Sequence, residues 1–234
     1  MLTGYGKREW SIILAVGVPA AAILFYFHWF IPAGLVVLAV LALLSFFRDP
    51  HRTIPPDRGA MVSPADGVVS SIHELENFPP LGERAVCIRI FLSVLNVHIN
   101  RSPCHCQVGP ITPKPGTYRD ARNPASAATN ESNLIVLLTP TGRRPIAAVR
   151  QVSGAIARRI VCGIAAGQVL QRGQRLGMIK FGSTTELYLP QSSQPRVNVT
   201  KGQRVYGGTT ILAFAGSAAD GPAPTAEPAP PSPA

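Results

Sequence analysis

Gly182-Ser183 is the pair of residues in this chain with the most specific chemical potential, and it lies between two apolar, strand-like runs. Glycine allows the backbone to take a strained conformation, from which a following serine hydroxyl can attack the preceding carbonyl and convert the amide into an ester. The other interpretation is a tight turn, which glycine and serine form in many β-rich domains. The pair therefore predicts either a turn or a peptide bond that the protein cleaves by itself.

A serine that attacks its own backbone needs a base to take its proton, and the base needs an acceptor that orients it. Of the five histidines, His98 lies at the end of a long apolar segment, where a partly buried imidazole is expected. Asp66 lies in a turn that opens another strand. Spacing alone also permits a core histidine bonded to a backbone carbonyl and an ordinary turn aspartate.

The chain is basic, with 22 Lys and Arg residues against 12 Asp and Glu and a formal charge of +10. A basic surface on an apolar chain suits anionic lipid headgroups at least as well as nucleic acid. The sequence has no Lys/Arg-rich run or aromatic-basic RNA signature, so no nucleic-acid partner is expected. The spacing of Cys104-His105-Cys106 is too short for paired metal ligands, so we expect reduced thiols and no metal.

Residues 11–47 are almost wholly apolar and contain no Asp, Glu, Lys or Arg. As one helix this segment would be about 55 Å long, against a hydrocarbon core of about 30 Å. Pro32 and Gly34 interrupt it, which predicts two helices, 11–31 and 33–47. We therefore expect an N-terminal membrane-anchoring helical hairpin over residues 1–47, either crossing the bilayer or re-entering it.

Positive residues flank both ends of the apolar region: Lys7 and Arg8 precede it, and Arg48 and Arg52 follow it. The positive-inside tendency then places both ends in the cytoplasm. A cleaved signal peptide fits poorly because the apolar region is too long. The prediction is an anchored or peripheral protein of the inner cell membrane, with its main domain on the cytoplasmic side.

After the hairpin the sequence becomes typical of a soluble domain and rich in strand-like patterns, which predicts one mainly β catalytic domain over residues 48–216. Arg172-Gly-Gln-Arg-Leu176 resembles Lys201-Gly-Gln-Arg-Val205, and such turns between short strands are typical of lipoyl-type hammerhead units. These turns favour a β-sandwich or barrel-sandwich-like fold. Residues 217–234, rich in Ala and Pro, predict a disordered tail. Residues 63–70 are expected to form a turn that leads into a strand. Strands are also expected over 85–100, 134–138 and 146–152, and a short helix or an irregular strand over 154–162.

Three ordered motifs carry a family resemblance: Ser63-Pro-Ala-Asp-Gly67, Asn96-Val-His-Ile-Asn100 and Phe181-Gly-Ser183. After an apolar anchor, they resemble the phosphatidylserine decarboxylase proenzyme family, and the short, pyruvoyl-dependent form is the closer match. The similarity runs from about Phe46 to Phe214. Smaller matching elements are Phe47-Arg-Asp-Pro50, Asn130-Glu131, Ala157-Arg-Arg159 and Tyr188-Leu-Pro190.

The resemblance implies a mechanism in which His98, oriented by Asp66, deprotonates Ser183. Ser183 then attacks the carbonyl of Gly182, and elimination leaves two chains, 1–182 and 183–234, the second beginning with a pyruvoyl group made from Ser183. That group forms a Schiff base with phosphatidylserine and acts as the electron sink for loss of carbon dioxide, which yields phosphatidylethanolamine. No other cofactor is implied. The implied partners are phosphatidylserine, an anionic membrane surface, and the two self-derived chains as a heterodimer or a higher oligomer of it.

The sequence departs from the family pattern at two positions. Leu95 stands where longer members carry a histidine, so His98 is expected to serve both processing and decarboxylation. Ser132 stands where an arginine commonly follows the Asn-Glu pair, which removes one implied substrate contact. The residues left for contact with the substrate headgroup are Arg101, Arg119, Arg122 and Asn130.

Two other classes of protein remain in competition at this stage. A pyruvoyl-dependent decarboxylase of a soluble amino acid would use the same residues but would not need the membrane hairpin. A non-enzymatic, membrane-anchored adaptor with a lipoyl-like body would explain the hairpin and the paired turns. Such an adaptor has no need for Asp66, His98 and Gly182-Ser183 together, so the lipid decarboxylase is the favoured hypothesis.

Overall fold

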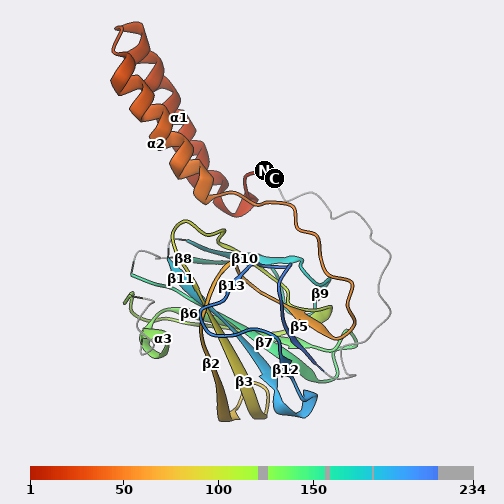
Figure 1. Ribbon diagram of the computed structural model, residues 1–234. Helices are drawn as coiled ribbons and strands as arrows, with labels where there is room; N and C mark the ends of the chain where they lie inside the picture. The colour runs from red at the N-terminus through yellow and green to blue at the C-terminus, as the bar shows by residue number, and fades with distance from the viewer. Residues whose placement is uncertain (121–125, 156–158, 181, 216–234) are drawn as a thin grey trace. The chain divides into compact units, whose positions relative to one another are not determined.

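The computed structural model describes residues 1–120, 126–155, 159–180 and 182–215 (Figure 1). The chain forms two compact units, of which the first is Met1–His51 and the second begins at Arg52. The predicted tail, Phe181 and Arg122 lie outside the described residues.

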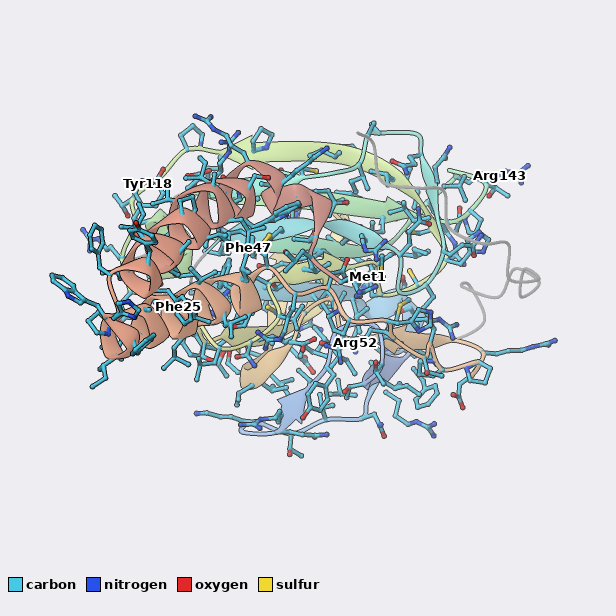
Figure 2. The ribbon with its side chains drawn as sticks, turned by 90° about the horizontal axis from the view of Figure 1, so that it is seen from above. Met1, Phe25, Phe47, Arg52, Tyr118 and Arg143 are labelled. Carbon is cyan, nitrogen blue, oxygen red and sulfur yellow. The ribbon has the colours of Figure 1, made fainter. Side chains whose placement is uncertain are left out.

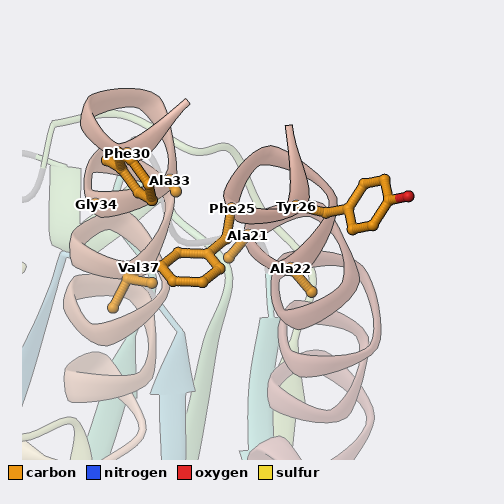
Figure 3. Close-up of a pocket in the computed structure, with 8 residues that line it drawn as sticks. All are labelled: Ala21, Ala22, Phe25, Tyr26, Phe30, Ala33, Gly34 and Val37. Atoms are coloured by element: carbon orange, nitrogen blue, oxygen red, sulfur yellow. The ribbon is translucent and has the colours of Figure 1, made fainter. Parts of the chain in front are cut away.

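The first unit consists of a 3-10 turn, Gly4–Gly6, and two helices, α1 (Lys7–Tyr26) and α2 (Phe30–Phe46). Gly17 of α1 lies directly against Val40 of α2, so the two helices pack closely at that point. The segment Gly4–Tyr26 is long and apolar enough to cross a membrane, and α2 is a shorter apolar helix. Near the turn, uncharged side chains line a groove between the helices, and these include Phe25, Phe30 and Val37 (Figure 3).

The predicted helix boundary at Pro32 and Gly34 is wrong. The chain turns earlier, between Tyr26 and Phe30, with His28 at a φ of 60°. Pro32 instead lies in the first turn of α2. A proline is tolerated there because the first backbone N–H groups of a helix have no partner within the helix.

The second unit is built on an eight-stranded sheet with the order β13-β2-β3-β11-β7-β6-β5-β9, whose recorded pairs are all antiparallel. The mainly β fold is therefore confirmed. The strands of this sheet are β2 (Gly67–Phe78), β3 (Glu83–Leu92), β5 (Cys106–Lys114), β6 (Ser132–Leu138), β7 (Pro145–Val152), β9 (Val169–Leu170), β11 (Ser183–Pro190) and β13 (Arg204–Val205).

Two three-stranded sheets complete the unit. One has the order β4-β10-β8, and the other has the order β1-β14-β12. The predicted strand 85–100 is in fact two strands, because β3 ends at Leu92 and β4 begins at Ile99 in a different sheet. The remaining elements are β1 (Ala60–Val62), β4 (Ile99–Arg101), α3 (Ser126–Thr129), β8 (Arg159–Cys162), β10 (Arg175–Lys180), a 3-10 turn (Gln191–Ser193), β12 (Arg196–Val197) and β14 (Ile211–Phe214).

The central strand β11 is buried on both faces. Because side chains alternate along a strand, Ser183 and Thr185 share a face with Leu187, which belongs to the main hydrophobic cluster. Tyr188 points to the opposite face and belongs to a second, smaller cluster. The candidate serine therefore lies at the first position of a fully enclosed strand.

The two Gly-Gln-Arg segments form similar turns. Gln174 Oε1 accepts a hydrogen bond from Gln171 N at 2.8 Å, and Gln203 Oε1 accepts one from Thr200 N at 3.0 Å. Each turn leads directly into a short strand, β10 or β13. The internal repeat is therefore a repeat of structure as well as of sequence, and its relation to lipoyl-type hammerheads stays a prediction.

The segment 52–57, which enters the second unit, is held against the body at several points. Ile54 fills a notch beside Gly173 and Gly208, where a side chain on either glycine would meet it. Arg172 donates to two backbone carbonyls of the segment, at 2.8 and 2.7 Å. Segment 52–57 is therefore fixed to the second unit by side-chain packing and by hydrogen bonds to its backbone.

Candidate active site

Ser183 begins β11, where it is paired with Leu92 of β3. Its side chain is completely buried, and Oγ has no hydrogen-bond partner among the residues that the structure describes. Leaving a buried hydroxyl without a partner costs about 1–3 kcal/mol. Such groups are uncommon in folded proteins and call for an explanation, which can be a catalytic role.

Gly182 has a φ of +56°, in the left-handed region that glycine occupies without strain. A Cβ at this position would meet only Val94 Cγ1, at an ordinary contact distance of 3.9 Å. The backbone conformation, rather than a lack of space, therefore requires glycine here. Its amide group donates to Nε2 of His98 at 3.3 Å.

His98 lies directly before β4 and is completely buried. Its carbonyl accepts a hydrogen bond from Ile179 N at 3.2 Å, which ties the residue to β10. Nδ1 lies 2.9 Å from the carbonyl oxygen of Asn96, which can only accept, so we assign the proton to Nδ1. Nε2 is then the unprotonated nitrogen, and it faces the Gly182-Ser183 segment. A histidine in this tautomer is able to act as a base there.

Asp66 has partners other than His98. Its Oδ1 accepts from Gly207 N, and its Oδ2 forms an ion pair with Arg52, both at 2.7 Å. Burial raises the pKa of Asp66, while the hydrogen bond from Gly207 and the charges of Arg52 and Arg101 lower it. In this arrangement the Asn96 carbonyl orients the ring of His98. An action of Asp66 on His98 stays a prediction.

A row of buried, hydrogen-bonded side-chain amides from β4, β7 and β6 reaches β11 at Thr185, two residues after the serine, and the sequence did not predict it. Asn100 donates to Thr185 Oγ1 at 3.0 Å and accepts from Gln151 at 2.8 Å. Asn133 in turn donates to Gln151 at 3.1 Å. Because Asn100 belongs to β4 and Thr185 to β11, the row fixes the strand after His98 against the strand that begins at Ser183. Polar residues at core-facing positions of otherwise apolar strands were the available signal.

The predicted headgroup contacts differ in their environments. Arg101 is buried and donates to the carbonyl of Gly173 at 3.0 Å, whereas Arg119 is exposed. Asn130 is buried, and its amide bonds to N and O of Arg119 and to O of Ser153, each at 2.8 Å. The side chain of Asn130 thus holds the Arg119 segment at the end of β7. Contact of these residues with a substrate headgroup stays a prediction.

A second missed feature lies on the other face of β11. Glu186 is buried between Arg89 and Arg150, with N···O distances of 3.7 and 3.6 Å. The hydroxyl of Tyr188 donates to Glu186 at 2.5 Å, and the ring of Tyr188 stacks on Phe78 with centroids 4.1 Å apart. Acidic and aromatic residues at alternate positions of one strand were the only sequence signal.

Intramolecular attack on a backbone carbonyl is the chemistry available at this strand end. That chemistry is characteristic of proenzymes that activate themselves, and it is the class to which the fold and the site point. The chain belongs to the phosphatidylserine decarboxylase family. The family model described as phosphatidylserine decarboxylase matches residues 41–213, a range that contains Asp66, His98 and Gly182-Ser183. The resemblance seen in the motifs is therefore confirmed.

Individual relatives agree with the family model. The chain is 41% identical over 211 residues to a protein of Pelobacter propionicus, with 90% of this chain and 91% of the relative covered. It is 46% identical over 178 residues to one of Carboxydothermus hydrogenoformans, with 76% and 82% covered. A protein of Symbiobacterium thermophilum is 42% identical over 206 residues, with 88% and 93% covered. Each of these relatives is named phosphatidylserine decarboxylase proenzyme.

Proposed function

We propose that this protein decarboxylates phosphatidylserine to phosphatidylethanolamine and carbon dioxide after it has cleaved its own backbone between Gly182 and Ser183. One observation carries the proposal: the buried hydroxyl of Ser183 has no partner in the described part of the chain, and it follows a left-handed glycine whose N–H faces Nε2 of His98. The names of the relatives support the choice of substrate.

Cleavage begins when Nε2 of His98 accepts the proton of Ser183 Oγ. The oxygen attacks the Gly182 carbonyl, and the proton passes to the departing amide nitrogen, so the peptide bond becomes an ester without an external reagent. Removal of the Cα proton of residue 183 then expels the Gly182 carboxylate. This step separates chain 1–182 from chain 183–234. Loss of ammonia, with uptake of water, leaves a pyruvoyl group at position 183.

The site fits such a group because residue 183 is enclosed and its side-chain oxygen has no recorded hydrogen bond that would have to be broken. The pyruvoyl carbonyl supplies an electron-withdrawing centre for the carbon that loses its carboxylate. The chain's own contribution is position and exclusion of water. Pairing with β3 holds residue 183 in place, and the amides of Asn100 and Gln151 lock the adjacent strands.

We assign Asp66 to the electrostatic support of His98. The turn that bears Asp66 is bonded to β4, since the carbonyl of Pro64 accepts from Arg101 N at 2.9 Å. An ionised carboxylate in this turn would favour the positive charge that His98 takes up during proton transfer. Burial raises the pKa of Asp66, and the hydrogen bond from Gly207 and the charge of Arg52 partly offset that rise in favour of the ionised form. The positive charges of Arg101 and Arg119, with Asn130 holding the Arg119 segment, are assigned to the substrate headgroup.

The proposal includes an inner-membrane location with the catalytic domain on the cytoplasmic side. The apolar segment Gly4–Tyr26 and its basic neighbours support anchoring by residues 1–47. The domain of residues 48–216 would then work at the surface where its lipid substrate lies, with 217–234 as a tail. The two self-derived chains would stay together as a heterodimer.

The test is an intact-mass measurement on the denatured protein, together with decarboxylation of phosphatidylserine in vesicles. We expect two chains, 1–182 and 183–234, of which the second lacks a free amine and reacts with a carbonyl reagent. Ser183→Ala should give one uncut, inactive chain, and His98→Ala should do largely the same. Ser70→Ala removes only a hydrogen bond to the Arg89 carbonyl, so it should be cut normally. Normal cleavage of Ser183→Ala would refute the processing site. An uncut wild-type chain would instead favour the hypothesis of a non-enzymatic adaptor.

A further inference from the structure

Large apolar side chains are unevenly distributed over the surface of the second unit. Among its described residues, five are exposed: Val94 (44%), Leu95 (80%), Tyr118 (42%), Val169 (49%) and Tyr206 (45%). The first three lie at the end of the large sheet where β11 begins with Ser183. Leu95 is the most exposed of the five, and apolar side chains that are exposed together mark interaction surfaces.

Val94 and Leu95 occupy the loop between β3 and β4. This loop follows Leu92, which is paired with Ser183, and Val94 Cγ1 would lie 3.9 Å from a Cβ placed at Gly182. N and Oγ of Ser93 both donate to Asn96 Oδ1, at 2.9 and 2.8 Å. These bonds hold Leu95 at the tip of a closed turn beside the cleavage site.

Tyr118 reaches the same end of the sheet through β6 and β7. Its hydroxyl donates to Glu131 at 2.6 Å, and the carbonyl of Glu131 accepts from Ser153 N at 2.9 Å. Ser153 directly follows Val152, which is paired with Thr184 of β11. In Figure 2, Tyr118 lies at the opposite end of the body from Arg143, which belongs to the turn between β6 and β7.

Positive charge accompanies these apolar residues. Arg119 adjoins Tyr118, and Arg159 is paired with Lys180 at the start of β8; both arginines are exposed. The nearby acids, Asp120 and Glu131, each have a partner group. Apolar and aromatic side chains next to arginine are the combination that suits the interface of an anionic bilayer.

We propose that Val94, Leu95, Tyr118, Arg119 and Arg159 form a lipid-contact surface that seats the active site on an anionic bilayer, with Leu95 entering the acyl region. This inference rests on the proposed function, because it places the reacting residue 183 beside the headgroups. The substrate amine and carboxylate then reach the site without the lipid leaving the membrane. Leu95, where longer family members carry a histidine, serves lipid contact in this chain.

The test compares Leu95→Glu with Val169→Glu in the full chain. Val169 is also an exposed apolar residue, but it is paired with Gln107, which is paired with Leu138 at the far end of the sheet. Decarboxylation is measured on phosphatidylserine in phosphatidylglycerol vesicles and on a short-chain phosphatidylserine dispersed as monomers. The quantity compared between variants is the rate on vesicles divided by the rate on monomers.

We expect Leu95→Glu to lower the ratio about tenfold, the size expected when one leucine is withdrawn from an apolar phase. Val169→Glu should leave the ratio as in the wild type. An unchanged ratio in Leu95→Glu overturns the inference. A wild-type chain that stays uncut, or that acts on neither substrate, instead overturns the proposed function, so the two failures are distinguishable.

A second measurement does not depend on catalysis. Leu95→Trp is bound to vesicles that contain lipids brominated along the acyl chain, and its fluorescence is compared with that of the wild type, whose Trp10 and Trp29 give the background. Additional quenching in Leu95→Trp supports insertion of the loop. Fluorescence at position 95 that the brominated lipids leave unquenched overturns it.

Discussion

Replacing Gly182 with alanine tests whether the left-handed backbone at the cleavage site is the reactive conformation. An L-residue at a φ of +56° is disfavoured by about 1–2 kcal/mol relative to a relaxed conformation. No clash adds to this, because the new Cβ would lie 3.9 Å from Val94 Cγ1. The strain should therefore depopulate the conformation that directs the Gly182 amide at His98. We expect cleavage to slow about 5- to 30-fold.

The assay follows the conversion of the single chain into two chains on a gel after a pulse of synthesis. Gly82→Ala is the matched control, because Gly82 has a φ of +75° and no atom of the described residues lies within 4 Å of its new Cβ. Gly82 lies in the turn between β2 and β3, at the other end of β3 from Ser183. The control should lose similar stability and be cleaved at the wild-type rate. If both variants were destabilised equally and both cleaved normally, the left-handed conformation of residue 182 would not be the reactive one.

Two further predictions concern buried charges. Arg52→Met removes the ion pair of Asp66 and should lower the unfolding free energy by about 3–5 kcal/mol at neutral pH. Burial raises the pKa of Asp66, so the unfolding free energy falls as pH rises from the ordinary pKa of an aspartate to the raised one, and it falls further without Arg52. Denaturant titrations should therefore show a smaller deficit in acid than at neutral pH, and a pH-independent deficit would contradict this. Tyr188→Phe loses the hydrogen bond to Glu186 but keeps the stack on Phe78, so its unfolding free energy should fall by about 1.5–3 kcal/mol. Wild-type stability in this variant would show that the bond is weak. Introducing Glu186→Gln into both the wild type and Tyr188→Phe measures the coupling energy between these two side chains.

The sequence predicted the mainly β body and the apolar helices because both depend on local patterns of hydrophobicity. It missed the position of the hairpin turn, since Pro32 is compatible with the first turn of a helix as well as with a break. It also joined β3 and β4 into one strand, because Val94 and Leu95 continue the apolar run although they lie in an exposed loop.

Within the candidate site, Ser183, Gly182 and His98 were predicted because the motifs contain them, and their catalytic roles stay predictions. The partners of these residues were not found, because they are set by pairing between distant strands. Asn133, Gln151 and Asn100 meet through the register of β6, β7, β11 and β4, which no local pattern specifies. The same is true of Asp66, whose partner Arg52 belongs to the segment that enters the body.

The place of β11 in the large sheet has a consequence for the stability of the protein after the proposed cleavage. The proposed chain that begins at residue 183 would contribute β11 and β13 to the large sheet and β12 and β14 to a small one, so the two fragments would interleave. The precursor folds as one molecule, with its strands delivered by a continuous backbone. Once the backbone is cut, refolding requires two molecules to meet and so depends on their concentration. The mature protein would then persist through slow unfolding rather than through easy recovery, and a single opening of the sheet could end its activity.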